Sequence, residues 1–466
     1  MTIQLHDTMA GANRELVPIE AGHVRIYSCG PTVYGPAHVG NFRSFLFADL
    51  LVRYLRYKGL GVTWVMNITD VDDKIIKRAT AEGSPIGLVS ERYLKLFLAD
   101  MTTLGVTLPD VMPKATEHIP QMVDLITKLL ETGHAYRTDD GSIFFRIASW
   151  PAYGRLARLD PEGMRVGERV EADEYGKDDV RDFALWKGPK PGEPSWETNI
   201  GPGRPGWHIE CSAMSMAYLG PSFDIHTGGI DLVFPHHQDE IAQSEATTGK
   251  TFVAYWMHCA FLQMNGQKMA KSSGNISTVT DLLSNGSSPR ALRLALMSAH
   301  YRMALSFGED SLQAANSAID RLDALFAAPS VYASNSPDDA SLPALLDGAR
   351  LAFETALDDD LNISPALAAV FELVRELNRR IDARTLSTAD AQLAINLLRD
   401  LDRVLGIAPA ADEGLEPELQ KLLDDGQAAR AAREWPASDY LRAELAERGI
   451  LVEDTRDGQR WRRADS

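Results

Sequence analysis

The first candidate site in this sequence is a set of cysteine, histidine and glutamate residues, because these side chains together can bind a metal ion. His236 and Glu240 lie four residues apart in the segment FPHHQDE, so on a helix they would share one face. Cys29 and Cys211 could add two thiolates from elsewhere in the chain. Two thiolates, an imidazole and a carboxylate make a plausible tetrahedral zinc site. Because these residues are far apart in sequence, the alternative of ordinary buried cysteines stays open.

A second candidate is a phosphate-binding loop at residues 31–41, PTVYGPAHVGN. This loop would join a strand to the start of a helix, where unpaired backbone N–H groups attract anions. Gly40 would let a ligand approach the backbone closely, and His38 and Asn41 would supply side-chain donors. A turn that contains a hydrogen-bonded histidine is the other interpretation, since the motif alone has low specificity.

Two further loops carry positive charge or a pair of glycines. In the segment NGQKMAKSSGN, Lys268 and Lys271 could neutralise the charge that develops on transferring phosphates. In the segment HTGGID, Gly229 and Asp231 would follow a strand, where an acidic side chain can bind ribose hydroxyls. The alternatives are an exposed basic loop and a tight glycine turn.

These loops need a sheet to bring them together, and the sequence predicts one. Residues 23–29 alternate apolar and polar side chains as a strand does, residues 42–58 have helical spacing, and residues 62–68 are typical of a second strand. Strand, glycine-rich loop, helix and strand form a βαβ unit, which indicates a parallel α/β sheet. Ligands bind such sheets at the carboxyl ends of the strands.

The rest of the chain changes character twice. The stretch from residue 109, rich in Gly, Pro and Trp, is expected to be an insertion, after which the α/β pattern returns. Beyond residue 306 the sequence is rich in Ala and Leu, and apolar stripes at helical spacing predict a helix bundle. One such stripe contains Leu393, Leu397 and Leu401. The expected segments are residues 1–108, 109–204, 205–305, 306–408 and 409–466.

Composition and charge limit the classes to which this chain can belong. Its 466 residues are 45% hydrophobic, which fits a globular chain with a sizeable core. The net charge of −18 argues against a surface coated in nucleic acid, but it says nothing about local basic patches. Three cysteines, the third being Cys259, do not make a disulfide framework, which indicates a reducing compartment. No stretch has the apolarity of a signal peptide or a membrane span, so we expect a cytoplasmic protein with no membrane partner.

Together these segments resemble one family, the cysteinyl-tRNA synthetases, which are class I aminoacyl-tRNA synthetases. The resemblance covers essentially the whole chain. It rests on YSCGPTVYGPAHVGN, with a HIGH-type signature at residues 38–41, and on KMAKS at residues 268–272, which is similar to KMSKS. It also rests on NITDVDDKI, PGWHIECSAM, DIHTGGIDLVFPHHQDEIAQ and YWMH. Asn41 replaces the last His of HIGH and Ala270 replaces the first Ser of KMSKS; we expect activity to survive, with a changed loop contact at Ala270.

The resemblance implies a fold and a metal site. The fold would be α/β, a Rossmann-like parallel sheet with an inserted connective domain, followed by an α-helical bundle and a small anticodon-binding module. One Zn²⁺ per chain would bind Cys29, Cys211, His236 and Glu240 and accept the substrate thiolate, whereas Cys259 would be structural. A metal–sulfur bond can discriminate between cysteine and serine. A pocket that selects by size alone discriminates poorly between them, because their side chains are nearly the same size.

The resemblance also implies a reaction and its partners. ATP, accompanied by Mg²⁺, would react with L-cysteine to give a cysteinyl-adenylate, and a monomeric enzyme would pass the acyl group to tRNA(Cys). The charge on the phosphates would be stabilised by His38, Asn41, Lys268 and Lys271. ATP would be held by Gly40, Gly229, Asp231 and Lys271, and cysteine by Thr69, Trp207 and His226. The anticodon would be read by Arg430, Trp435, Asp439 and Asp454, where Trp435 could equally be a packed helix residue.

Three other functions fit the sequence less well. A zinc hydrolase would need the HExxH order or its inverse, and Ile241 stands where the inverse needs a histidine. A cysteine ligase of thiol biosynthesis, which joins cysteine to an amino-sugar inositol, would need no anticodon module; the basic and aromatic residues of 449–463 argue against it. A catalytically inactive tRNA-binding protein would not need His38 and both signature lysines.

Overall fold

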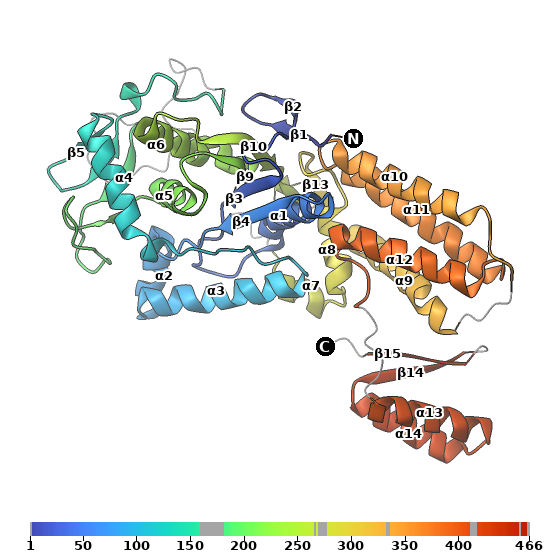
Figure 1. Cartoon of the computed structure of the whole chain (residues 1–466). Coiled ribbons are helices and arrows are strands. Elements are labelled where there is room, and N and C mark those ends of the chain that lie inside the picture. Colours follow the sequence, from blue (N-terminus) through green and yellow to red (C-terminus); the bar gives the residue numbers. More distant parts are fainter. Residues whose placement is uncertain are drawn as a thin grey trace. The chain divides into compact units, whose positions relative to one another are not determined.

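The computed structural model of the chain describes residues 2–158, 181–264, 267–268, 277–331, 336–410, 417–455 and 458–463 (Figure 1). These residues form two compact units. The first unit contains residues 1–318, 349–370 and 401–407, and the second contains residues 319–348, 371–400 and 408–466. The five segments expected from the sequence stay a prediction. Among the described residues, no helix combines the length and apolarity that crossing a membrane requires.

A four-stranded parallel sheet is the main sheet of the first unit (Figure 1). Its strand order is β10–β9–β3–β4, with the strands at Val253–Cys259, Phe223–Gly229, His23–Ser28 and Gly61–Met66. All three pairings are parallel, so the predicted α/β sheet is confirmed. Every residue of β9 before its last glycine is buried, as expected for a strand that is covered on both faces.

The direction of strand addition reverses between β3 and β9. Strand β3 connects through helix α1 (Val39–Tyr57) to β4 on one side, whereas β9 connects through α6 (Gln238–Thr248) to β10 on the other. Such a reversal opens a crevice outside the carboxyl ends of the strands. Cys29 directly follows β3 and Gly229 ends β9, so two of the segments singled out in the sequence lie at this reversal.

A second, antiparallel sheet shares an apolar cluster with the two helices that carry the candidate metal ligands Cys211 and Glu240. Its order is β5–β6–β7–β8, at Ala135–Arg137, Ile143–Phe145, Phe183–Lys187 and Arg204–Pro205. Helix α5 (Trp207–Leu219) begins one residue after β8. Buried residues of α4 (Ile119–Glu131), β6, β7, α5, β9 and α6 form one continuous apolar cluster. This packing ties the helices of the site to two sheets at once.

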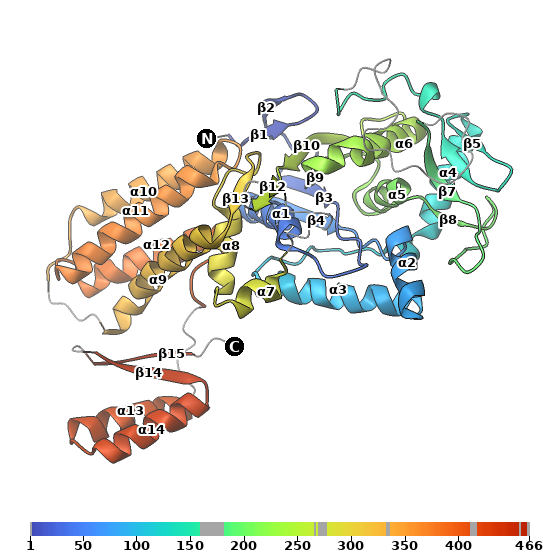
Figure 2. The ribbon, with the colours of Figure 1, turned by 180° about the vertical axis from the view of Figure 1, so that it is seen from behind.

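The remaining elements of the first unit include smaller sheets and helices. A hairpin is formed by β1 (Gln4–Asp7) and β2 (Ala12–Glu15). Strands β12 (Gln267–Lys268), β11 (Leu262–Met264) and β13 (Leu305–Phe307) form a sheet in that order (Figure 2). The helices are α2 (Asp73–Glu82), α3 (Ile86–Thr103), α7 (Val279–Ser284) and α8 (Pro289–Met297).

The later part of the chain is helical, as predicted. Its long helices are α9 (Glu309–Val331), α10 (Leu342–Asp358), α11 (Ile363–Asp382) and α12 (Thr388–Leu405). One detail of the predicted stripe on α12 is wrong, because Leu393 is 53% exposed. The buried face of α12 contains Ala394, Leu398 and Leu401. Ala394, the residue after Leu393, is thus the one that is buried at this point of the helix.

The last elements of the second unit make a small module of their own. Helices α13 (Pro417–Ala431) and α14 (Trp435–Glu447) precede the hairpin of β14 (Ile450–Thr455) and β15 (Gly458–Arg463). Leu419, Leu423, Leu445 and Ile450 form its buried core, with Trp461 packed against it. The hairpin therefore completes the apolar core that two short helices alone would leave open.

A buried ion pair fixes helix α1, whose N-terminus faces the site, against α8. Asp49 is fully buried and lies 2.6 Å from the guanidinium of Arg293 and 2.9 Å from that of Arg53. It also accepts a hydrogen bond from the backbone N–H of Thr107. Burial raises the pKa of Asp49, but the two arginine charges outweigh burial, and the pKa lies below its ordinary value.

Asp49→Asn is expected to lower the free energy of unfolding by about 3–5 kcal/mol, because Arg293 is left buried without a counter-charge. Urea denaturation measures this loss. The matched control is Glu91→Gln, which removes the exposed Glu91–Lys95 pair and should leave stability unchanged. Because the pKa of Asp49 is lowered by folding, its contribution is complete above pH 4 and is lost as the pH falls below that. Equal stability of wild type and Asp49→Asn at neutral pH would contradict this account.

Candidate functional site

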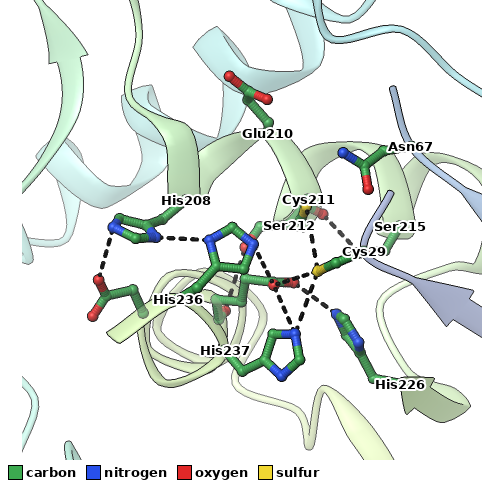
Figure 3. Close-up of polar contacts among 12 residues, drawn as sticks. Cys29, Asn67, His208, Glu210, Cys211, Ser212, Ser215, His226, His236 and His237 are labelled. Atoms are coloured by element: carbon green, nitrogen blue, oxygen red, sulfur yellow. Dashed lines mark hydrogen bonds and ion pairs between the residues drawn. The ribbon is translucent and has the colours of Figure 1, made fainter. Parts of the chain in front are cut away.

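The four candidate metal ligands come from four elements that meet near the carboxyl end of the main sheet. Cys29 follows β3, and Cys211 lies on the first turns of α5. His236 lies in the kinked segment Val233–His237, and Glu240 lies one turn later in α6. Figure 3 shows the side chains of Cys29, Cys211 and His236 pointing toward one another. The sequence spacing predicted a shared face for His236 and Glu240, and their side chains do meet.

The ligand atoms of these four residues all lie within 4.8 Å of one another. The sulfurs of Cys29 and Cys211 are 3.9 Å apart, and Cys29 Sγ is 3.8 Å from Oε1 of Glu240. His236 Nε2 is buried and lies 3.1 Å from the same carboxylate oxygen, at ion-pair distance. An imidazole nitrogen beside two sulfurs and a carboxylate oxygen completes a donor set that suits a bound cation.

The electrostatics of this cluster favour a positive charge. Burial raises the pKa of Cys211, but its hydrogen bond with Cys29 and the charge of His236 bring the pKa down to about 6. Burial also raises the pKa of Glu240, yet the charges and hydrogen bonds of His226 and His236 lower it to about 2. A thiolate and a carboxylate thus share one buried space. Burial raises the pKa of Cys29. Burial lowers the pKa of His236, but Cys211 and Glu240 raise it to about 10. Metal binding would therefore have to displace a proton from Cys29 and from His236.

The structure offers a second possible ligand set, which sequence reasoning missed. Cys29, His226, His237 and Glu240 also have ligand atoms within 4.8 Å of one another. His237 Nε2 lies 3.3 Å from Cys29 Sγ, and His226 Nε2 lies 3.0 Å from Oε2 of Glu240. The only sequence signal for His237 is the histidine pair of FPHHQDE. Both sets share Cys29 and Glu240 and differ in the other two ligands.

Side chains behind His236 fix the orientation of its ring. His208 Nδ1 lies 2.8 Å from His236 Nδ1, and His208 Nε2 lies 3.3 Å from Oδ2 of Asp239. Tyr153 donates its hydroxyl to the other oxygen of Asp239. Trp207 stacks on His236 with ring centroids 4.1 Å apart, and its own ring is partly exposed. The predicted pocket residue Trp207 therefore lies directly beside a candidate ligand.

The other two residues predicted for the cysteine pocket are buried near the same cluster. His226 stacks on Trp256 and contacts Glu240, so it lies behind that carboxylate. Thr69 donates its hydroxyl to Glu210, which precedes Cys211 in α5, at 2.9 Å. Burial raises the pKa of Glu210 well above its ordinary value. Sequence reasoning missed Glu210.

Two of the predicted nucleotide-binding segments are described, at the start of α1 and at the end of β9. His38 precedes the first turn of α1, and its backbone N–H donates to Oδ1 of Asn41 at 3.2 Å. The first turn of α1 carries no acidic residue, which leaves its positive end suited to an anion. A Cβ atom at Gly229 would lie 2.5 Å from Oδ1 of Asp231, so a larger residue there would have to displace that carboxylate.

The signature lysines and the anticodon residues are only partly described. The backbone of Lys268 pairs with Gln263 in the β11–β12 ladder, while Lys271 lies outside the described residues. Arg430 lies over the ring of Trp435 at 5.6 Å, and that ring is 53% exposed. The remaining two residues are Asp439, exposed on α14, and Asp454, in β14 with its side chain outside the described part.

Comparisons with family models cover nearly the whole chain. The class I catalytic domain described as "tRNA synthetases class I (C)" matches residues 15–317. A DALR domain matches residues 352–409, and the cysteinyl-tRNA ligase anticodon binding domain matches residues 412–462.

Full-length relatives and solved structures agree with these models. The cysteine–tRNA ligase of Alkalilimnicola ehrlichii is 45% identical, covering 99% of this chain and 100% of the relative. That of Symbiobacterium thermophilum is 44% identical and covers 100% of both chains. In fold alone, the chain is similar to Mycobacterium tuberculosis methionyl-tRNA synthetase in complex with methionyl-adenylate, with a TM-score of 0.57 at 16% identity over 89% of this chain and 96% of that one. The Agrobacterium radiobacter K84 agnB2 LeuRS–tRNA–LeuAMS complex gives 0.60 at 12% identity over 84% and 85%.

The parallel sheet, its reversal and the matching catalytic domain define a class I aminoacyl-tRNA synthetase. Within that class, the anticodon domain and the relatives that match along the whole length are specific to cysteine. The chain belongs to the cysteinyl-tRNA synthetase family, the cysteine–tRNA ligases.

Cys211→Ala distinguishes the two ligand sets, because Cys211 belongs to only one of them. We expect this variant to bind metal more than about 100-fold less tightly, since a ligand contributes more than the 10–100-fold of an outer partner. Metal content after dialysis and chelator competition measure the effect. Cys259→Ala is the matched control, because Cys259 is also buried and belongs to neither ligand set. Full metal content in Cys211→Ala would favour the set that contains His237.

Proposed function

We propose that this enzyme activates L-cysteine with ATP as cysteinyl-adenylate and transfers the acyl group to tRNA(Cys), using a zinc site to select the thiolate. The observation that carries the proposal is the convergence of Cys29, Cys211, His236 and Glu240, with Cys29 directly after β3 and α1 next along the chain. A sulfur-binding site and an anion-binding site would thus follow the same strand. Cysteine activation needs both, because the thiol must be recognised while the carboxylate attacks a phosphate.

The donor set and its spacing fit zinc. Zn–S bonds of about 2.3 Å at tetrahedral angles hold two sulfurs roughly 3.8 Å apart. Cys29 and Cys211 hold theirs 3.9 Å apart. Two sulfurs, one nitrogen and one oxygen are ligands that borderline-soft zinc accepts and that magnesium and calcium do not. Zinc, when bound, supplies a centre that binds a thiolate far better than it binds the hard hydroxyl of serine.

The residues around the ligands would position the substrate for attack. Trp207 is partly exposed and stacks on His236, so its ring can form one wall of the cysteine pocket. Thr69 and His226 would complete the pocket, held in place by Glu210 and Glu240. A pocket with fixed walls holds the carboxylate of cysteine close to the α-phosphate, which lowers the entropy that the reaction must lose.

The phosphate-binding residues would act on ATP. His38 and Asn41 at the start of α1, with Lys268 and Lys271, would stabilise the negative charge that develops as the carboxylate attacks and pyrophosphate leaves. Gly40 and Gly229 would allow close approach of the nucleotide, Asp231 would bind ribose hydroxyls, and Mg²⁺ would accompany ATP. The enzyme needs no covalent nucleophile. Burial raises the pKa of Cys259, the one cysteine outside the ligand sets, to about 11, which suits a structural role.

The C-terminal module would read the anticodon. The exposed ring of Trp435, with Arg430 over it, can stack on an unpaired base, and Asp439 and Asp454 can accept hydrogen bonds from base edges. The presence of this module disfavours the ligase that acts on an amino-sugar inositol, which has no anticodon to read. We further propose that the enzyme works as a monomer in the cytoplasm; gel filtration with light scattering tests its mass.

Cysteine-dependent ATP–pyrophosphate exchange tests the first half of the reaction. We expect exchange with L-cysteine, one zinc per chain in the same sample, and kcat/KM lower for serine by about 10⁴-fold, because serine lacks the group that the site binds. Removal of zinc with a chelator should abolish exchange, and added zinc should restore it. Exchange that does not depend on cysteine, or that continues after all zinc has been removed, would contradict the proposal.

Asp454→Ala tests the anticodon role. We expect kcat/KM for tRNA(Cys) to fall about 10-fold or more, since one base contact contributes about 1–3 kcal/mol. ATP–pyrophosphate exchange should be unchanged, because it does not involve the anticodon. Asp425→Ala, an exposed change on α13, is the control. Equal charging by Asp454→Ala and wild type would remove Asp454 from the anticodon site.

A further inference from the structure

We propose that Thr8, His258 and His237 form a directional hydrogen-bond relay that makes His237 an N–H donor to the sulfur of Cys29. His237 and His258 are then positioning residues, which act on the metal site through Cys29. Thr8, in the segment after β1, would be the far end of the relay. The inference rests on the proposed metal site and assigns a role to three residues that the reaction above does not use.

The relay is continuous in the structure. Thr8 Oγ1 lies 2.7 Å from His258 Nδ1, and His258 Nε2 lies 2.8 Å from His237 Nδ1. His237 Nε2 lies 3.3 Å from Cys29 Sγ, an ordinary distance for a hydrogen bond to sulfur. Figure 3 shows the last of these contacts, with the His237 ring directed at Cys29. Three contacts thus connect the N-terminal segment with a candidate ligand.

Chemistry allows one direction of donation along this chain. When Cys29 binds the metal as a thiolate it has no proton, so His237 Nε2 must then carry the hydrogen of the 3.3 Å contact with Cys29. A neutral imidazole with its proton on Nε2 has a bare Nδ1, which must accept from His258 Nε2–H. His258 Nδ1 is then bare in turn and accepts from the hydroxyl of Thr8. The thiolate therefore sets the tautomer of both histidines, and the hydroxyl of Thr8, which can donate or accept, acts as the terminal donor.

Packing holds the relay in place. The His237 and His258 side chains are buried, and both rings lie against Trp256. The backbone of Thr8 donates to the carbonyl of Trp256 at 2.8 Å, and the backbone of Trp256 donates to Asp7 at 3.1 Å. These bonds anchor the segment after β1 to β10, so the position of the Thr8 hydroxyl is fixed by main-chain contacts.

The relay would orient the Cys29 thiolate and strengthen its bond to the metal. Residues that hydrogen-bond to a metal ligand fix its orientation, and their loss weakens metal affinity by about 10–100-fold. In the alternative ligand set His237 itself would bind the metal through Nε2, and that nitrogen would then have no proton to donate to Cys29. The two roles of His237 exclude each other, which makes the relay testable.

The decisive comparison is Thr8→Val with Thr8→Ser in the full chain. Thr8→Val keeps the shape of the side chain but removes the donor; we expect about 10-fold weaker zinc binding in chelator competition. In the cobalt-substituted protein we expect a shift of the sulfur-to-cobalt charge-transfer band. Thr8→Ser should match wild type in both measurements. Thr63→Val is the control, because it removes a 2.9 Å threonine–histidine bond, to His23, that lies outside the site.

A second pair of variants tests the relay independently, in case Thr8→Val does not fold. His258→Phe keeps a ring beside Trp256 and should weaken zinc binding by about 10–100-fold, and His258→Gln, which can still donate to His237, should recover most of the loss. His237→Gln should still bind zinc. Wild-type affinity in both Thr8→Val and His258→Phe, or complete zinc loss in His237→Gln, would overturn the relay while leaving the proposed function intact. A wild-type protein without zinc would overturn the proposed zinc site as well.

Discussion

The pairing of β3 with β9 is the interaction on which the site depends. These strands lie about two hundred residues apart in sequence, yet Tyr27 pairs with His226 and Ser28 with Thr227 in parallel register. The hydroxyls of Ser28 and Thr227 are 2.7 Å apart, and the backbone of Cys29 donates to the carbonyl of Thr227. A shift of one residue would turn every side chain of one strand to the opposite face. This register therefore sets how Cys29 approaches the histidines and Glu240.

Buried polar groups lie near the carboxyl ends of the strands, where an ordinary apolar core would have none. Glu240, His226 and His237 are fully buried, and burial of unpaired charges is strongly destabilising. Each is held by hydrogen bonds or ring contacts to another polar side chain of the same cluster. The apolar cluster shared by α4, α5, α6 and the two sheets keeps this polar group rigid and away from water. Rigidity here serves selectivity, because a loose ligand cage would accept other donors.

Much of the fold could be predicted from the sequence, because periodicity is a local property. The strands at residues 23–29 and 62–68 were placed to within two residues, and the helix between them begins three residues earlier than expected, at Val39. Leu393 shows the limit of that reasoning. Its spacing fits the stripe, but a helical face drifts, and tertiary packing decides which neighbour is buried.

The site was predictable only as far as residue types and family motifs reach. Cys29, Cys211, His236 and Glu240 do converge, although their spacing could not show it. The partners behind them could not be read from the sequence. His208, His258 and Glu210 act through contacts between distant segments, and no period or motif marks which histidine faces which. The same holds for Asp49 and Arg293, a buried ion pair that joins helices 244 residues apart.

The net charge of −18 is a property of the whole surface and did not exclude a nucleic-acid partner. Binding depends on where basic and aromatic side chains are concentrated, as Arg430 and Trp435 are on the C-terminal module.

The spread of the ligands along the chain has a consequence for the newly made protein. Cys29 precedes Cys211 by 182 residues, and Glu240 comes later still. At about 5–20 residues per second on the ribosome, Cys29 waits roughly 10–40 s before its first ligand partner has been synthesised. During that interval it is a lone thiol on an unfinished chain, open to oxidants and to stray metal ions. A site whose ligands are this far apart in sequence therefore needs its first thiol to stay reduced until the remaining ligands have been made.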